Sequence, residues 1–442
     1  MNVSMTTKIL ILGAGKSATF LIQYLQKKAV ENNWHILLAD HDILLAKEKW
    51  NNQSCGEAIA VNIVDSFERA SIIQKSTVVV SMLPAALHHL VAEDCLKFEK
   101  SLFTASYVDE AMAQLDTAVK NKGLLFLSEM GLDPGIDHMS AMQLIDKIKA
   151  FGGKITGFKS HCGGIIAPEC DTNPWHYKIS WNPRNIILAG KAGAIFLEEG
   201  QHKQQNYLQL FEHNKQITIP KLGALAYYPN RNSLSYINTY CLQGVKNFVR
   251  TTLRYPEFCK GWNVIVQLGL TNETIWENNA PTTIQEWFLK LCANSDFKNK
   301  YELYMQDPTI AQQINYLSFT NNDALPSFVN SNASLLQWRL EQKWALSPTD
   351  KDLVVMMHEI EYTFQGKQYL VQSAMTLKGI DGHYTAMAKT VGYPLAMGVC
   401  AYLNGEIKLT GIQIPTHPEI YIPLLEKLSQ EDIVFTDITT EI

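Results

Sequence analysis

Short apolar runs alternate with helical patterns over residues 8–127. Lys8–Leu12 is rich in isoleucine and leucine and predicts a strand, and Ala18–Ala29 then repeats apolar residues at helical spacing. Further strands are predicted at His35–Ala39, Ala58–Val61, Thr77–Met82, Leu102–Ala105 and Leu124–Leu127. Because a parallel crossover needs a connection long enough to hold a helix, this alternation predicts an α/β fold with a doubly wound parallel sheet.

The pattern changes at Gly131–Gly135, where a turn precedes a helix predicted over Met139–Ala150. Asp133 and Asp137 are both possible N-caps of that helix, and Asp137 is the more natural of the two. The region Pro256–Leu346 is rich in helical patterns and suits a cap or an oligomer contact. We place the first domain boundary at the turn.

Strand patterns return near the end of the chain. Leu353–Glu361 and Tyr369–Leu377 alternate like a half-buried antiparallel pair joined across Gln365–Gly366, and Thr385–Glu426 is mostly helical. The expected domains are residues 1–135 plus 390–442, a second α/β domain of residues 136–255 plus 347–389 that binds substrate and forms the dimer, and a helix-rich insertion of residues 256–346.

Composition narrows the class of partner. The net charge of -5 at pH 7 offers no basic surplus for nucleic acid, which favours a small-molecule partner. The 8 cysteines include no CxxC pair and predict reduced thiols without a metal site. No apolar run is long enough for a membrane helix, and no leader is evident, so we expect a cytoplasmic protein.

Gly13-x-Gly15-x-x-Ala18 lies between the first predicted strand and helix. Gly13 permits a tight turn, Gly15 lets the backbone approach a pyrophosphate, and Ala18 allows close helix packing. This context predicts a Rossmann dinucleotide-binding domain, whereas the alternative is a structural turn without a ligand.

Asp40 closes the second predicted strand, where a carboxylate can accept hydrogen bonds from the adenosine ribose and repel a 2′-phosphate. No arginine lies nearby, only His41 and the more distant Lys47. The sequence therefore favours NAD as cofactor, with NADP as the alternative. A solvated aspartate in a turn is the other explanation of Asp40.

Several longer motifs extend the pattern beyond a generic Rossmann protein, and they are Thr104–Val108, Gly131–His138, Cys162–Glu169, Tyr177–Trp181, Tyr228–Arg231, Thr251–Tyr255 and Ala386–Gly392. Together they resemble the saccharopine dehydrogenase family, in its glutamate-forming branch, over nearly the whole chain. The resemblance implies that NAD(P)+ oxidises the carbon beside the secondary amine of saccharopine. Water then splits the imine into glutamate and 2-aminoadipate 6-semialdehyde.

The resemblance also assigns residues to ligands. For the cofactor we expect Gly13, Gly15, Lys16, Ser17, Asp40, Leu83, Ser106, Leu132, Pro134, Gly135 and His138. For the substrate we expect Ser106, Tyr107, Asp133, Trp181, Arg231, Thr252 and Arg254. Arginine suits the three carboxylates of saccharopine because its planar fork binds a carboxylate through two donors. Without the surrounding motifs, an ordinary ion pair would be the better explanation of the two arginines.

Proton transfer needs a group that takes a proton from the amine and activates water against the imine. Asp133, Tyr107, Cys162 and His138 are the candidates, and the first three are our expected catalytic residues. Cys162 forms part of the wall of the site, because the reaction requires no thiol nucleophile. Family members that break down lysine resemble this chain in carrying an acidic residue at the position of Asp40, which favours the catabolic direction.

Two alternatives stay open. A related imine dehydrogenase of polyamine synthesis, of the carboxynorspermidine or homospermidine type, would share the Rossmann half but differ in its carboxylate anchors. A non-catalytic NAD-binding regulator would need no pocket for a tricarboxylate, so Tyr107, Asp133, Arg231 and Arg254 argue against it. We also expect a homodimer.

Overall fold

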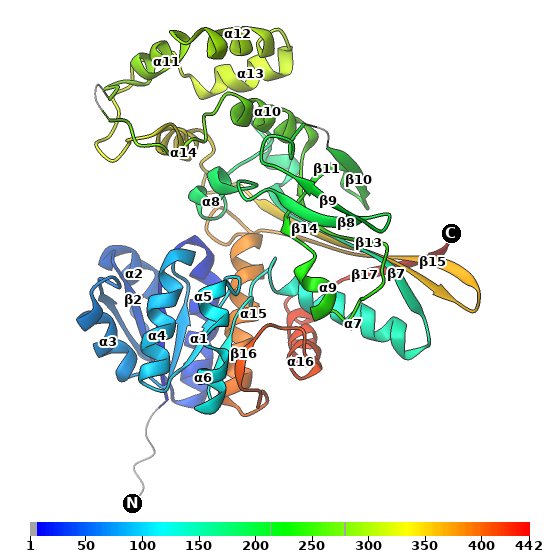
Figure 1. Cartoon of the computed structure of the whole chain (residues 1–442). Helices are drawn as coiled ribbons and strands as arrows, with labels where there is room; N and C mark the ends of the chain where they lie inside the picture. Colours follow the sequence, from blue (N-terminus) through cyan, green and yellow to red (C-terminus); the bar gives the residue numbers. More distant parts are fainter. Residues whose placement is uncertain (1–6, 213, 278–279) are drawn as a thin grey trace, which may run out of the picture. The chain divides into compact units, whose positions relative to one another are not determined.

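The structure, a computed structural model, describes residues 7–212, 214–277 and 280–442 (Figure 1). The chain forms two compact units. The first unit runs up to Gly152 and includes His383–Phe435, whereas the second comprises Gly153–Gly382 and Thr436–Ile442. Each unit contains its own β-sheet. None of the helices within the described ranges is long and apolar enough to cross a lipid bilayer.

A parallel sheet forms the centre of the first unit, with seven strands among the described residues in the order β16-β6-β5-β4-β1-β2-β3. The strands are β1 (Lys8–Leu12), β2 (His35–Asp40), β3 (Gly56–Ala60), β4 (Val78–Ser81), β5 (Ser101–Thr104), β6 (Leu125–Leu127) and β16 (Gly411–Gln413). β4, β5 and β6 are buried along their whole length, as expected for parallel strands covered on both faces.

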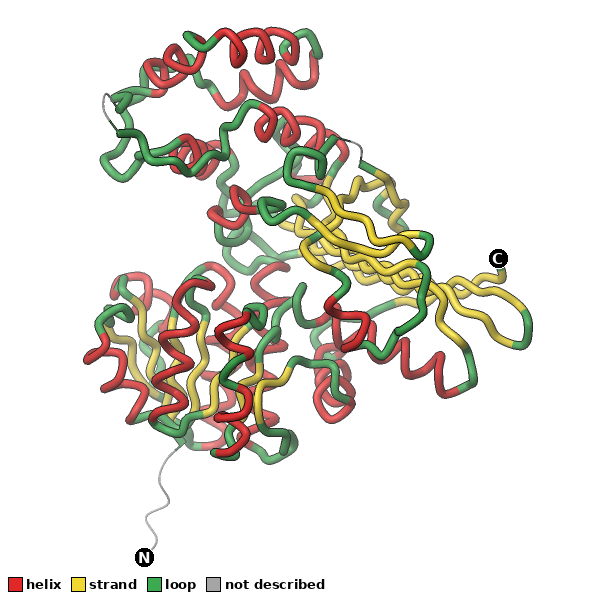
Figure 2. The backbone as a smooth tube through the Cα atoms, viewed as in Figure 1, coloured by secondary structure: helices red, strands yellow, loops and turns green. Residues whose placement is uncertain are grey.

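Helices flank both faces of this sheet (Figures 1 and 2), with α1 packed on α15 and α3 packed on α4. The helical segments are η1 (Lys16–Ala18), α1 (Thr19–Asn32), α2 (Ile43–Trp50), α3 (Ser66–Gln74), η2 (Ala85–Leu87), α4 (His88–Lys97), α5 (Glu110–Ala113), α6 (Asp116–Asn121), α7 (Ile136–Ala150), α15 (Ala386–Leu403) and α16 (Pro418–Ser429). The strand order reverses between β1 and β4, and ligands of doubly wound proteins bind at the carboxyl ends of the strands at such a point.

The structure confirms the doubly wound parallel sheet and each strand predicted from residues 8–127. The helix predicted over Ala18–Ala29 is confirmed as α1, and Ala18 lies in the 3-10 turn that leads into it. The prediction for the start of α7 was wrong. Asp137 is not an N-cap, because α7 begins at Ile136 after Gly135, and Asp137 lies in its first turn.

A mixed sheet forms the centre of the second unit, with ten strands in the described ranges. They are β7 (Lys154–Ile166), β8 (Ala194–Glu198), β9 (Gln201–Gln205), β10 (Lys215–Ile219), β11 (Gly223–Pro229), β12 (Arg231–Asn232), β13 (Asn247–Arg254), β14 (Asp352–Phe364), β15 (Lys367–Lys378) and β17 (Thr436–Glu441). The main path is β10-β11-β13-β7-β14-β15-β17, in which β13 and β7 are parallel and the other neighbours are antiparallel. The predicted hairpin of β14 and β15 is confirmed, and Gln365 and Gly366 turn it with positive φ.

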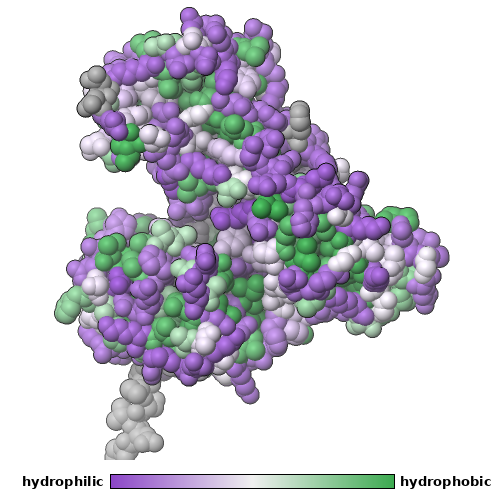
Figure 3. All heavy atoms as spheres, in the orientation of Figure 1, coloured by the Kyte–Doolittle hydropathy of each residue, from purple (hydrophilic) through white to green (hydrophobic). Residues whose placement is uncertain are grey.

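Helices and an aromatic core complete the second unit. The helical segments are η3 (Pro168–Cys170), α8 (Pro183–Leu188), α9 (Ser235–Thr239), α10 (Pro256–Gln267), α11 (Ile284–Cys292), α12 (Ser295–Tyr304), α13 (Pro308–Leu317) and α14 (Asn332–Lys343). The predicted helix-rich region is thus confirmed. The core of the second unit includes four fully buried tryptophans, namely Trp175, Trp262, Trp287 and Trp344. Figure 3 shows hydrophilic residues along much of the outer rim of α11–α13, in keeping with apolar side chains directed into this core.

The unit boundaries fall at different residues from the expected domain boundaries. α7 packs on α16 and so stays in the first unit, although we expected residues from 136 onward in the second domain. β17 pairs with β15 in the second sheet, although we expected the whole of 390–442 in the first domain. The region 256–346 shares its core with β8 and β11 of the second unit.

Candidate functional site

The glycine turn after β1 has the geometry that its sequence predicts. Gly13 has φ +102° and donates its N–H to the Ala39 carbonyl at 2.8 Å, and a Cβ there would lie 3.0 Å from the carbonyl oxygen of Met82. A Cβ at Gly15 would meet no described atom within 4 Å. Gly13 is therefore required by the fold, whereas the surface at Gly15 is open to a ligand. Lys16 is exposed and Ser17 is half-buried beside it.

Asp40 is bonded into the same turn. Its Oδ2 accepts the Ala14 N–H at 2.7 Å, and its Oδ1 accepts the Asp42 N–H at 3.0 Å. His41 Nδ1 lies 2.8 Å from Oδ1, although the imidazole itself is 89% exposed. The carboxylate is thus held at the ends of β1 and β2, and its remaining lone pairs can accept further hydrogen bonds.

The loops after β4 and β5 carry a hydrogen-bonded group around Ser106. Ser106 Oγ lies 2.7 Å from Nε2 of the buried His88, and His88 Nδ1 lies 2.9 Å from Ser81 Oγ. Leu83, a predicted cofactor residue, follows β4 and is half-buried. His88 was not predicted as a site residue, because the adjacent pair His88 and His89 in an apolar segment has no spacing that marks either histidine.

The turn between β6 and α7 brings Asp133 to Tyr107, whose hydroxyl donates to Asp133 Oδ1 at 3.3 Å. The Asp133–Pro134 peptide is cis, and Leu132 is buried. Gly135 has φ +145°, and a Cβ there would lie 2.0 Å from the carbonyl oxygen of Gly131. Only glycine fits this position, so the motif preserves the shape of the turn that presents Asp133.

His138 lies one turn further, in α7, and is fully buried. Its Nε2 is 2.7 Å from Glu129 Oε2, and Glu129 Oε1 accepts the Val108 N–H at 3.1 Å. The imidazole thus belongs to a buried pair that supports the segment after Ser106. Its predicted contact with the cofactor stays a prediction.

Two predicted substrate residues, Thr252 and Arg254, share one face of the second sheet. Thr252 on β13 is paired with Cys162 on β7 and with Tyr228 on β11, so the three side chains lie on the same face. Arg254, two residues after Thr252, lies on that face as well. Burial raises the pKa of Tyr228 to about 12, and the charge of Arg254 opposes this rise.

Arg254 is a buried cation without a described counter-ion. Only 5% of it is exposed, and Nη1 donates to the Leu253 carbonyl at 2.7 Å. Its guanidinium carbon lies 5.3 Å from the ring centre of Tyr177 and 5.6 Å from that of Phe258. Within the described ranges, its buried Nε–H has no hydrogen-bond partner and no carboxylate pairs with the group. Since a buried charge is costly without a partner, this site suits an anionic ligand.

Trp181 and Arg231 take different places in the second unit. Trp181 is half-buried, and its Nε1–H donates to the Tyr177 hydroxyl at 2.9 Å, which connects it to the ring beneath Arg254. Arg231 is exposed on β12, whose backbone pairs with Ala194 on β8, and has φ +53°. Tyr177 and Tyr228, both inside the recognised motifs, were missed as contributors to this face.

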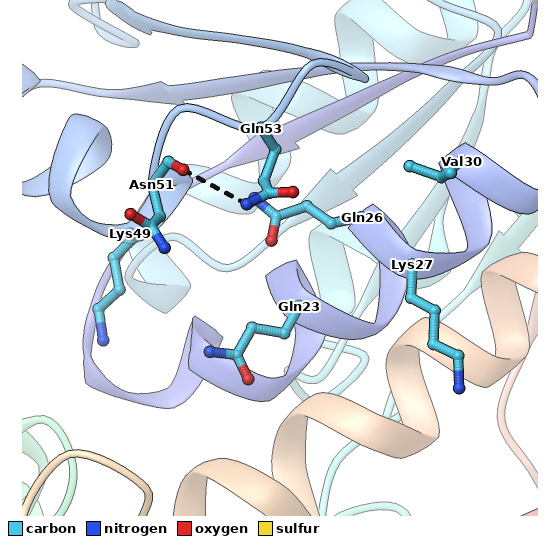
Figure 4. Close-up of a pocket in the computed structure, with 7 residues that line it drawn as sticks. All are labelled: Gln23, Gln26, Lys27, Val30, Lys49, Asn51 and Gln53. Atoms are coloured by element: carbon cyan, nitrogen blue, oxygen red, sulfur yellow. Dashed lines mark hydrogen bonds between the residues drawn. The ribbon is translucent and has the colours of Figure 1, made fainter.

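A polar pocket of about 280 Å³ also lies in the first unit. Side chains of α1, α2 and the turn after α2 line it, namely Gln23, Gln26, Lys27, Val30, Lys49, Asn51 and Gln53 (Figure 4). Gln53 donates to the Asn51 carbonyl at 3.3 Å. None of the predicted site residues lines this pocket. No metal-binding group of three histidine, cysteine or acidic residues occurs among the residues with a described placement.

A parallel sheet with a glycine turn and a carboxylate at the ends of β1 and β2 defines a protein with a Rossmann-type NAD(P)-binding domain. Residues 9–127 match the family model described as the saccharopine dehydrogenase NADP binding domain. Residues 131–434 match the one described as the saccharopine dehydrogenase C-terminal domain. The chain belongs to the saccharopine dehydrogenase family.

Relatives with curated names support this membership. Alpha-aminoadipic semialdehyde synthase of Arabidopsis thaliana is 32% identical over 423 residues, which cover 89% of this chain and 40% of that protein. The chain spans about half or less of the plant and mammalian relatives it matches, between 40% and 49% of their length. Saccharopine dehydrogenase (NADP(+), L-glutamate-forming) of Schizosaccharomyces pombe is 29% identical over 96% of this chain and 97% of that protein.

A solved structure agrees with this assignment. The apo saccharopine dehydrogenase (L-Glu forming) of Saccharomyces cerevisiae has a TM-score of 0.86 at 26% identity, covering 98% of this chain and all of that one. A homospermidine synthase of Legionella pneumophila reaches a TM-score of 0.53 at 10% identity over 98% of this chain and 91% of that one. This second likeness shows the fold alone.

Proposed function

We propose that this protein oxidises L-saccharopine to L-glutamate and 2-aminoadipate 6-semialdehyde. The observation that carries the proposal is the buried guanidinium of Arg254, which stands on aromatic rings without a described counter-ion. A substrate carboxylate would supply the missing negative charge through two parallel hydrogen bonds. The names of the fungal relatives that match this chain along nearly their whole length support the same reaction.

The residues of the chain bind and orient the substrate and exchange protons with it. When bound, NAD(P)+ supplies the acceptor for the hydride that leaves the carbon beside the secondary amine. Arg254 and Arg231 hold carboxylates, and Thr252 and Trp181 shape the surrounding wall that includes Cys162. These roles follow the positions predicted from the motifs.

Asp133 is the residue that we propose for proton transfer, with Tyr107 as its partner. The Tyr107 hydroxyl already donates to Asp133, so the pair can pass a proton between the substrate amine and a water molecule. The other candidates are less suited to this role, because His138 is fully buried against Glu129 and Cys162 is buried in the second sheet.

For the cofactor we propose a preference for NAD over NADP. The glycine turn fits a dinucleotide, since the backbone at Gly15 is open where a pyrophosphate would approach. Asp40 places a negative charge at the ribose end of such a ligand. The matching family model and the fungal relatives are named for NADP, so the preference rests on Asp40 alone.

The test is a saccharopine-dependent assay of NADH and NADPH formation, with glutamate measured as product. Arg254→Met keeps the volume and removes the charge, and should raise the KM for saccharopine roughly 30-fold or more. The Kd of this variant for NADH should equal that of the parent protein. The exposed Arg231 offers a matched comparison, and Arg231→Met should raise the KM for saccharopine by a smaller factor. A folded protein that reduces neither dinucleotide with saccharopine would refute the proposed function.

A further inference from the structure

One buried imidazole joins the ends of two neighbouring parallel strands. Ser81 ends β4, Thr104 ends β5, and His88 opens α4 between them in the chain. His88 Nδ1 lies 2.9 Å from Ser81 Oγ, whereas Nε2 lies 2.7 Å from Ser106 Oγ and 3.5 Å from Thr104 Oγ1. His88 is only 5% exposed and Ser81 is fully buried, whereas Ser106 is partly exposed just beyond the carboxyl end of β5.

The imidazole is neutral at physiological pH. Burial lowers the pKa of His88 to about 4, and the carboxylate of Asp109 opposes this shift only in part. A neutral imidazole has one N–H donor and one acceptor nitrogen, so its two contacts with serine differ in direction.

The surroundings of Ser81 set that direction. Among the residues that the structure describes, His88 Nδ1 is the one hydrogen-bond partner of the buried Ser81 hydroxyl. A buried hydroxyl proton without an acceptor costs more free energy than an unused lone pair. The Ser81 hydroxyl lies 2.9 Å from Nδ1, whereas the buried Thr104 hydroxyl lies 3.5 Å from Nε2, so the closer contact decides and the Ser81 O–H donates to Nδ1. The proton of His88 then sits on Nε2 and donates to Ser106 Oγ, which leaves the Ser106 hydroxyl proton free to turn outward.

We infer that His88 is a positioning residue that makes Ser106 a hydrogen-bond donor to a carboxylate or amide carbonyl oxygen of the bound ligand. In the proposed function, on which this inference rests, that oxygen belongs either to a substrate carboxylate or to the nicotinamide carboxamide. The two sources share the same chemistry, and the arms of the test separate them.

Two substitutions of His88 separate the contact made by Nε2 from the contact made by Nδ1. Glutamine at position 88 can place a side-chain amide N–H near the position of Nε2, whereas asparagine reaches only the position of Nδ1. His88→Gln should therefore retain activity within about threefold, and His88→Asn should cost roughly tenfold, the value of one hydrogen bond. A loss in saccharopine KM or kcat with an unchanged Kd for NADH assigns the oxygen to substrate. A rise in the Kd for NADH, measured by protein fluorescence, assigns it to the cofactor.

A double-mutant cycle separates positioning from general support of the fold. In a Ser106→Ala background, His88→Asn should cause little further loss, because the group that it positions is absent. Equal losses in both backgrounds, or equal losses for the glutamine and asparagine variants, would overturn the inference. The binding of NADH tests His88 even if saccharopine proves not to be the substrate, so the two failures can be told apart.

A spectroscopic measurement on the unmodified protein reports the tautomer of His88, and a variant is needed only to assign the signal. Nitrogen-15 NMR of the histidine rings in the unmodified protein should show His88 protonated on Nε2 and bare on Nδ1 at neutral pH. The signal is assigned by its absence from His88→Gln, or by its response to Ser81→Ala. The opposite tautomer, with the proton on Nδ1, would contradict the direction proposed for Ser106.

Discussion

Single polar side chains at the strand ends were predictable to very different extents. Asp40 stands at a fixed spacing from a glycine turn, and the structure bonds its carboxylate to that turn at Ala14. His88 has no such spacing, because its partners Ser81 and Ser106 meet it only once β4 and β5 are side by side. Buried polar networks of this kind depend on tertiary contacts, so they escape a reading of the sequence.

The charge of Asp40 should govern the choice between dinucleotides. Asp40→Asn keeps an oxygen that can accept the Ala14 N–H and removes the charge that repels a 2′-phosphate. The ratio of kcat/KM for NADP+ to that for NAD+ should rise about tenfold, which corresponds to about 1.4 kcal/mol. Steady-state kinetics with both dinucleotides measure this ratio, and an unchanged value would count against Asp40 as the ribose ligand.

Protonation of His88 should make the protein less stable in acid. The pKa of the folded group is lowered to about 4 from 6.5 by burial, so between these pH values the unfolded chain binds more protons. The free energy of unfolding should therefore fall by up to about 3 kcal/mol as pH drops through this window. Urea titrations of the parent protein and His88→Gln measure the difference. The variant should show the shallower dependence, and identical slopes would contradict the shift.

Elements with strong local patterns were predicted well, whereas elements that depend on distant partners were missed. The strands near Gly13 and the β14 and β15 hairpin follow from apolar runs and turn residues. β16 has three residues, and β17 is exposed along its whole length, so neither carries an apolar pattern. Both strands form because they pair with a neighbouring strand, β16 with β6 and β17 with β15. The start of α7 was predicted wrongly because the turn at Gly131–Gly135, which precedes the helix, sets its first residue.

The two glycines of the turn after β1 should respond differently to alanine. Gly15→Ala adds a Cβ into open space, so the free energy of unfolding should change by less than about 1 kcal/mol while the Kd for NADH rises tenfold or more. Gly13→Ala meets a positive φ and the Met82 carbonyl, and should destabilise the fold by about 1–3 kcal/mol. Thermal melts and fluorescence titrations measure both effects. Equal destabilisation by the two substitutions would refute this division of roles.

At the scale of the whole molecule, the first unit is assembled from two separate stretches of chain. α15 is buried along most of its length and packs against α1, so a fragment that ends at Gly152 would expose the apolar face of α1. Such a fragment should lack a cooperative thermal transition and should bind NADH at least tenfold more weakly than the full chain. Circular dichroism and fluorescence titration test this expectation. A cooperative melt with an unchanged Kd would show that residues 7–152 fold alone.

Because Gly153–Gly382 separates the two stretches of the first unit, these stretches are also translated at different times. A ribosome that has released the glycine turn and the first six strands of the parallel sheet has still to translate the whole of Gly153–Gly382 before α15 emerges. At a typical 5–20 residues per second, the incomplete sheet waits for roughly 10 to 50 seconds with an apolar helix face uncovered. The turn at Gly13 and Gly15 is thus translated well before α15, the helix that completes its unit, and the whole of Gly153–Gly382 is made in between.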